Sequence, residues 1–178
     1  LLSGDTVTPL NDAQQGGSTF VNGLNNAGVA VGNVDFRYGF RAVYWKDGTS
    51  IDLEPYTDGD WVYSSANGIN DHGDIVGFTG LGSAKHAFVW KDGQIQDLNT
   101  LADLTGLPQT GYIAFESAFD INNAGQIIAK GPNQTIYLLT PSVPEPTEIT
   151  MMLAGLFVLS GWARKRAAFS KHAQKAIA

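Results

Sequence analysis

Residues 21–53, VNGLNNAGVAVGNVDFRYGFRAVYWKDGTSIDL, decide the fold, because they return 45 positions later as residues 66–98, ANGINDHGDIVGFTGLGSAKHAFVWKDGQIQDL. The two stretches align without a gap and share 13 of 33 residues, where chance would give about two. Self-similarity at a fixed spacing is the mark of a repeat architecture. The chain therefore contains a structural unit of about 45 residues that occurs at least twice.

A third, shorter copy begins at Ser117. SAFDINNAGQIIA (117–129) matches SANGINDHGDIVG (65–77) at an offset of 52, and TIYLLTP (135–141) stands where the tryptophan segment should be. The opening DTVTPLN (5–11) resembles GQIQDLN (93–99), so we expect residues 1–12 to end an earlier unit. The predicted β-repeat domain spans residues 1–140, with units at about 18–62, 63–113 and 114–140.

Turn signals divide each unit into four short strands. Asn-Asn-Ala-Gly at 25–28 and Asn-Asp-His-Gly at 70–73 separate a first pair of apolar runs, and Asp-Gly at 47–48 and 92–93 separates a second pair. Asn and Gly accept the positive φ angles of tight hairpins. The sequence therefore predicts an all-β fold of repeated four-stranded antiparallel units, similar in size to β-propeller blades. Because three units are too few for ordinary closure, either further blades precede residue 1 or the sheets form an open stack.

Aromatic residues fall into two groups. Trp45 and Trp90 recur at the same repeat position, which is typical of packing residues, and we expect both to be buried. The others lie in the variable segments between repeats, where they are candidate contacts to a sugar or a protein, or else partly buried anchors. These are Tyr56, Trp61, Tyr63 and Tyr112.

No pattern of catalytic residues is recognisable. The chain has no cysteine, which removes thiol catalysis and Cys-ligated zinc, and it has no nucleophile elbow, phosphate loop or HExxH motif. The sequence therefore predicts a protein that is not an enzyme and holds no cofactor or metal. The alternative is an extracellular glycan hydrolase, which needs two carboxylates about 5–10 Å apart. The residues considered for that role are Asp58, Asp60 and Glu116.

Charge is distributed unevenly. Residues 1–146 carry 6 Lys+Arg and 16 Asp+Glu, a net −10, while residues 147–178 carry 5 and 1, a net +4, and together they give −6. An acidic body repels phosphate backbones, so we expect no nucleic-acid binding. Residues 1–12 lack a basic region followed by a long apolar run, so we expect the native N-terminus to be missing from this sequence.

The repeated Asn-Gly motif, the Ala-x-x-Trp segment and the closing Asp-Leu together resemble the HAF-type extracellular repeat family over residues 18–140. That resemblance implies an exported protein of unassigned molecular activity. It supplies no catalytic residues.

The composition changes abruptly after Pro141. A Pro-rich linker at 141–146 contains Val143-Pro144-Glu145-Pro146 and precedes the apolar segment TEITMMLAGLFVLSGWA (147–163) and the basic triplet Arg164-Lys165-Arg166. As a helix, 17 residues span roughly 25 Å, close to the ~30 Å of a hydrocarbon core. We therefore predict a transmembrane helix at 147–163 with its basic stop at 164–166, a cytoplasmic tail at 167–178, and residues 1–146 outside.

This order of linker, apolar helix and basic end resembles the PEP-CTERM sorting signal of Gram-negative bacteria. The resemblance implies recognition by an exosortase-type membrane protease or transpeptidase, cleavage near Pro144-Glu145-Pro146, and release from the inner membrane to the cell surface or extracellular matrix. A retained membrane anchor is the alternative, because twelve residues follow the basic triplet. The predicted function is a structural or binding module whose partners are exopolysaccharide or other surface proteins.

Overall fold

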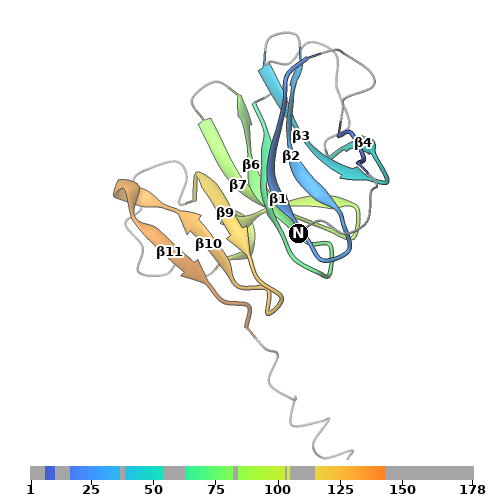
Figure 1. The fold of residues 1–178 in the computed structure, drawn as a ribbon. Helices are drawn as coiled ribbons and strands as arrows, with labels where there is room; N and C mark the ends of the chain where they lie inside the picture. The colour runs from blue at the N-terminus through green and yellow to red at the C-terminus, as the bar shows by residue number, and fades with distance from the viewer. Residues whose placement is uncertain are drawn as a thin grey trace, which may run out of the picture. The chain divides into compact units, whose positions relative to one another are not determined.

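Three antiparallel β-sheets, one from each repeat, make up the described part of the chain (Figure 1). The computed structural model describes residues 7–10, 17–36, 39–53, 63–81, 84–102, 104 and 115–142. Residues 1–141 form one compact unit and residues 142–178 a second. All strands and helices given below belong to the first unit.

Each sheet is a meander in which neighbouring strands follow one another along the chain. The first sheet contains β1 (Thr19–Leu24), β2 (Ala30–Phe36), β3 (Gly39–Lys46) and β4 (Thr49–Asp52). The second contains β5 (Ser65–Ile69), β6 (Ile75–Leu81), β7 (Ala84–Lys91) and β8 (Gln94–Asp97). The third contains β9 (Ser117–Ile121), β10 (Ile127–Lys130) and β11 (Ile136–Leu139). The prediction of an all-β fold with four-stranded antiparallel units is confirmed for the first two repeats, and the third has three described strands.

Glycine and aspartate take left-handed conformations at the predicted hairpins. Asp47 and Asp92 both have φ of 52°, and the glycines after them have φ of 78° and 80°. Two successive residues with positive φ form the tight turn whose twist matches that of the flanking strands. The predicted turns between β3 and β4 and between β7 and β8 are therefore confirmed.

The three sheets share one register, so their positions correspond one to one. Positions correspond at an offset of 45 from the first sheet to the second. From the second sheet to the third the offset is 52 for β9 and β10 and 49 for β11. The first strand of each sheet contains a β-bulge, centred on Asn22, Asn67 and Phe119. A bulge turns its extra residue out of the regular pleat, and all three bulges lie at the same repeat position.

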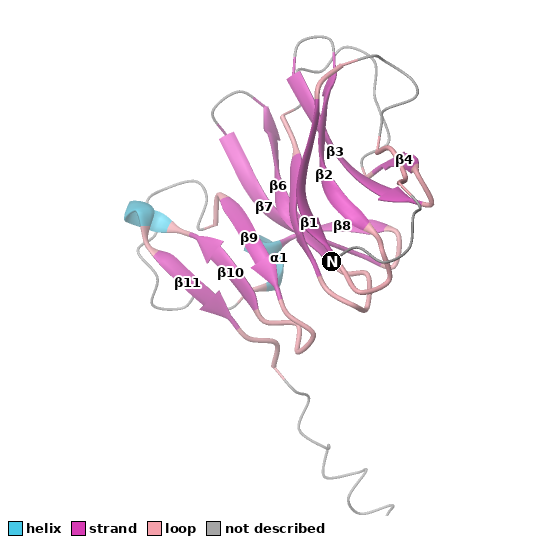
Figure 2. Ribbon diagram, in the orientation of Figure 1, coloured by secondary structure: helices cyan, strands magenta, loops and turns pink. Residues whose placement is uncertain are grey.

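Apolar cores fill the gaps between successive sheets, which stand side by side in chain order (Figure 2). Burial of such side chains stabilises the fold by about 1.5–3 kcal/mol for each large residue. The core of the first and second sheets comprises Val31, Ala42, Leu53, Ala66, Ile69, Ile75 and Phe88. The core of the second and third comprises Val76, Ala87, Val89, Leu98, Phe115, Ala118, Ile121, Ile127 and Ala129.

The two repeated tryptophans occupy equivalent register positions but differ in burial. Trp45 is fully buried on the outer side of the first sheet, with Val34 and Val43. Trp90 is only partly buried and packs against Tyr44, with ring centroids 5.6 Å apart. The prediction that both are buried is therefore wrong for Trp90, because its ring lies beside the core rather than within it.

The last leucine of each repeat packs into the next core. Leu53 lies in the core between the first and second sheets, and Leu98 lies in the core between the second and third. Leu10, at the equivalent position of the opening segment, packs beside Trp45 on the outer side of the first sheet. Residues 7–10 are not in a strand, although their sequence resembles β8.

Two short helices were not predicted. The single turn α1 (Leu98–Leu101) follows β8 and is capped by Asp97, whose side chain accepts from the Asn99 backbone N–H; η1 (Pro132–Gln134) links β10 to β11. Neither helix of the described residues has the length and apolar character needed to cross a bilayer. The predicted transmembrane helix at 147–163 lies outside the described residues.

Candidate interaction site

A ladder of asparagine side chains joins the turns of the three sheets. The turn residues Asn25, Asn70 and Asn122 each accept, through Oδ1, hydrogen bonds from two backbone N–H groups of their own turn. Asn25 Nδ2 then donates to the Asn70 carbonyl oxygen at 3.1 Å, and Asn70 Nδ2 donates to the Asn122 carbonyl oxygen at 3.3 Å. Each asparagine thus closes its own turn and binds the next one.

The bulge asparagines make a second set of bonds between sheets. Asn22 Nδ2 donates to the Ala66 carbonyl oxygen at 2.9 Å, and Asn67 Nδ2 donates to the Ala118 carbonyl oxygen at 2.7 Å. Both also reach the serine before that alanine, Ser65 at 3.1 Å and Ser117 at 3.4 Å. These bonds hold the first strands of neighbouring sheets together.

A glycine follows each bulge asparagine, and close approach explains it. A Cβ on Gly68 would lie 2.8 Å from the Cα of Asp120 in the next sheet, nearer than side chains tolerate. At the equivalent position, a Cβ on Gly23 would lie 3.1 Å from Val31 Cγ2 and 3.6 Å from the Cα of Gly68 in the next sheet. The sequence indicated a turn signal here, but Asn22-Gly23 lies within a strand and serves sheet-to-sheet contact. The clue was an asparagine repeated three residues before the turn itself.

Asp71 lies at the centre of a second row of turn side chains. Asp71 Oδ1 accepts from the Asn26 backbone N–H at 3.0 Å, and Oδ2 accepts from the side-chain amides of Asn26 and Asn123, each at 2.8 Å. The backbone bond from Asn26 first, and then the two amides, lower the pKa of Asp71 below its ordinary value of 3.8, because each stabilises the charged form.

This arrangement predicts a specific acid response. A lowered folded-state pKa means that the stabilisation by Asp71 is present above pH 3.8 and is lost as the pH falls through the folded-state value. We expect Asp71→Asn to melt below wild type near neutral pH, and the gap to close in acid. Melting curves of both proteins across the pH range measure this, and a gap that is independent of pH would contradict it.

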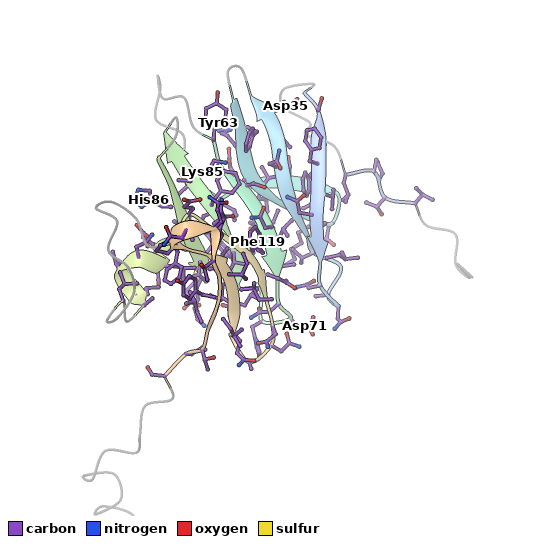
Figure 3. All side chains as sticks on the ribbon, turned by 90° about the vertical axis from the view of Figure 1, so that its left-hand side faces the viewer. Asp35, Tyr63, Asp71, Lys85, His86 and Phe119 are labelled. Atoms are coloured by element: carbon purple, nitrogen blue, oxygen red, sulfur yellow. The ribbon has the colours of Figure 1, made fainter. Side chains whose placement is uncertain are left out.

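Tyr63 is the one candidate aromatic ligand contact among the described residues. Its ring packs edge-on against Phe40, with centroids 5.3 Å apart, and Phe40 in turn meets Phe78 at 6.1 Å. Lys85 Nζ lies 4.3 Å from the centre of the Phe78 ring. Figure 3 shows Tyr63 at the opposite end of the sheets from Asp71. Tyr63 thus joins a packed cluster between the first and second sheets, as expected of a partly buried anchor.

The repeated Asp of each closing Asp-Leu contacts a side chain of the neighbouring strand. Arg41 Nη1 lies 2.7 Å from Asp52 Oδ2, and at the equivalent position His86 Nδ1 lies 2.8 Å from Asp97 Oδ2. Asp97 also caps α1 through its second oxygen, at 2.8 Å from the Asn99 backbone nitrogen. His86 therefore holds the place that an arginine holds in the first repeat.

The remaining candidate residues are not brought together. Glu116 Oε2 pairs with Lys130 Nζ at 3.0 Å. Within the described ranges, no three side chains of His, Asp or Glu gather as metal ligands do. The other candidates lie outside the described residues: Tyr56, Asp58, Asp60, Trp61, Tyr112, Val143, Pro144, Glu145, Pro146, Arg164, Lys165 and Arg166.

Comparisons with protein-family models, with curated proteins and with solved structures find no match to this chain.

Proposed function

We propose that this chain is an exported repeat module that acts as a structural or binding element at the cell surface or in the extracellular matrix. The observation that carries the proposal is how the repeated polar residues are used. Asn22, Asn25 and their equivalents bind the next sheet, and the repeated Asp52 and Asp97 pair within their own sheets. The repeated residues build a scaffold, and the variable segments are left for recognition.

The sheets of the proposed module are propeller-like blades. Each of the first two is a four-stranded meander, and β5 lies against both β1 and β9, so the first strands are neighbours. Blades of a propeller are arranged in this way around their first strands. The partners we propose are exopolysaccharide or other surface proteins, because the variable segments of blades sorted to the cell surface would be presented to such molecules.

The proposed route to the surface rests on the C-terminal sequence. The Val143–Pro146 motif, the apolar segment, which is uncharged from Ile149 to Ala163, and the basic triplet have the order of a PEP-CTERM signal. Prolines at 144 and 146 fix φ and disfavour helix in the residues before them, which suits an extended, protease-accessible segment. We propose that an exosortase-type enzyme processes the chain at this point.

Fractionation and C-terminal mass mapping of the native protein test this proposal. We expect wild type at the surface or in the medium with a new C-terminus near Pro146, and Glu145→Ala held in the membrane with Ala178 intact. Glu148→Ala, two residues beyond the motif, is the matched control and should be processed as wild type. A wild-type protein kept in the cytoplasm with Ala178 would overturn export, and a membrane-bound wild type with Ala178 would overturn only the cleavage.

A further inference from the structure

We infer that the chain self-associates head to tail, with the outer face of its third sheet docked against the first sheet of a second copy. This inference rests on the described sheets and is independent of the proposed sorting route. Within the residues that the structure describes, an interface between successive sheets occurs twice, and these two surfaces are the halves of it that no described sheet covers.

The third sheet presents the first unmatched half. Its β10 and β11 strands expose Ile128, Ile136 and Leu138, which are 42%, 54% and 62% accessible. The equivalent residues of the second sheet are Val76, Ala87 and Val89, and all three are buried against the third sheet. In the first sheet, the equivalent Val31 and Ala42 are buried against the second. Apolar side chains at these positions are thus matched by a following sheet in both earlier cases.

The first sheet presents the other half, along β1. Leu24 is 69% accessible and Val21 is also exposed. Their equivalents in β5 are Ile69 and Ala66, which lie buried in the core shared with the first sheet. The equivalents in β9, Ile121 and Ala118, lie buried in the core shared with the second sheet. The first strand of every later sheet is therefore covered by the sheet before it.

The rest of the outer face of the first sheet is already closed. Ala30, Val43 and Trp45 are buried there, with Leu10 packed against them. Leu10 holds the place that Leu53 and Leu98 hold within the two internal interfaces. Its presence is thus compatible with a preceding sheet, and the exposed docking surface is confined to β1.

At one pair of positions, both surfaces carry residue types that differ from those of the internal interfaces. Inside the chain, the bulge asparagine of one sheet binds the serine and the alanine of the next, as Asn67 does with Ser117 and Ala118. In a head-to-tail contact the corresponding residues are Phe119 on one copy and Phe20 on the other. Both are exposed, at 42% and 52%. The polar pair of the internal interfaces is replaced on both sides at once by an aromatic pair, which suits apolar contact.

The turn ladder also continues across the proposed contact. Asn122 and Asn123 of the third sheet stand where Asn70 and Asp71 stand in the second, facing the following turn. In the second copy that turn is Asn25–Asn26. Asp120 replaces the close-approach glycine in the third sheet, so we expect the two copies to stand farther apart at this point than neighbouring sheets do within the chain.

Because the two halves differ, the interface is heterologous, and it produces either a closed ring or an open filament of copies. A twofold contact between two third sheets would use only one of the halves. This difference makes the inference testable with variants that block one end each.

The experiment uses the full chain in a density-matched detergent, so that the C-terminal segment is the same in every sample. One variant carries Phe20→Lys and Leu24→Lys, and the other carries Ile136→Lys and Leu138→Lys. Leu101→Lys, an exposed apolar residue of α1 away from both faces, is the matched control. Sedimentation equilibrium over a concentration series measures the mass, and melting curves verify that each variant folds.

We expect wild type and Leu101→Lys to exceed the monomer mass, and each double variant alone to remain monomeric. An equimolar mixture should form a 1:1 complex, because each variant retains the half that the other lacks. A monomeric wild type would overturn the inference. So would association of the Phe20→Lys, Leu24→Lys variant by itself, which would indicate the twofold contact, or a mixture that remains monomeric.

A milder exchange keeps the test decisive if a lysine variant fails to fold. We expect Phe119→Asn or Phe20→Ser alone to weaken association about tenfold. The two together rebuild the Asn–Ser pair of the internal interfaces and should recover most of that loss. If the double variant instead loses as much affinity as the two single variants together, the two residues are not in direct contact.

Discussion

Phe88→Ala should lower the free energy of unfolding by about 3–5 kcal/mol, the range for truncating a buried aromatic residue. Phe88 is fully buried in the core between the first and second sheets. Its neighbours in that core include Ala42 and Ala66. Their side chains are single methyl groups, which are too short to fill the space that the Phe88 ring would leave. The cavity therefore persists, and the lost contacts are not recovered.

Urea denaturation of the two proteins measures this difference. Phe119→Ala is the matched control, because Phe119 is the same residue type but is exposed on β9; at low protein concentration we expect a change below about 1 kcal/mol. Similar losses for the two variants would show that the gap between the first and second sheets is not the main core.

Asn70→Ala should lower the free energy of unfolding by about 3 kcal/mol, since buried polar groups that lose their partner cost about 1–3 kcal/mol each. Asn70 is buried, and its Oδ1 accepts from the backbone N–H groups of His72 and Asp74. Its Nδ2 also donates to Asn122 in the next sheet. Alanine therefore leaves both the turn and the sheet-to-sheet contact unsatisfied.

Asn122→Ala is the matched control for this prediction. Asn122 makes the same bonds within its own turn: its Oδ1 accepts from Ala124 and Gln126, and its Nδ2 donates to Gln126 at 2.8 Å, as Asn70 Nδ2 does to Asp74 at 3.0 Å. Unlike Asn70, it is exposed. Water replaces these bonds more easily, so we expect a loss of about 1 kcal/mol. Thermal melts of the two variants, with the protein dilute, give the difference. Equal losses would mean that the bond to the next sheet contributes nothing.

Local signals were enough to predict the strands and hairpins. Asp47-Gly48 and Asp92-Gly93 have positive φ, which their residue types favour. Because the repeat returns after 45 residues, each strand predicted in one repeat is also predicted in the next. The bulge at Asn22 could not be predicted, because its side chain binds a strand of another sheet, 44 residues away in sequence. The partial exposure of Trp90 has the same origin, since it depends on how far the neighbouring sheet covers the ring.

The candidate site was harder to predict than the fold. Tyr63 was predicted from its place in a variable segment, and its packing against Phe40 depends on the approach of two sheets. The sorting motif, the apolar segment and the basic triplet stay predictions from sequence. Sequence reasoning missed the asparagine ladder. A tight turn alone is enough to explain the presence of these asparagines, so their bonds to the next sheet could not be recognised in the sequence.

The placement of Leu53 and Leu98 has a consequence for how such a protein grows by gene duplication. Each repeat ends on a leucine that is buried beneath the next repeat rather than within its own sheet. A duplicated segment of 45 residues therefore carries, on one face, the apolar residues that pack against the following sheet and, on the other, those that pack against the preceding sheet. Copies inserted in tandem always meet with matching halves, so the array can lengthen or shorten by whole units while every internal core stays complete.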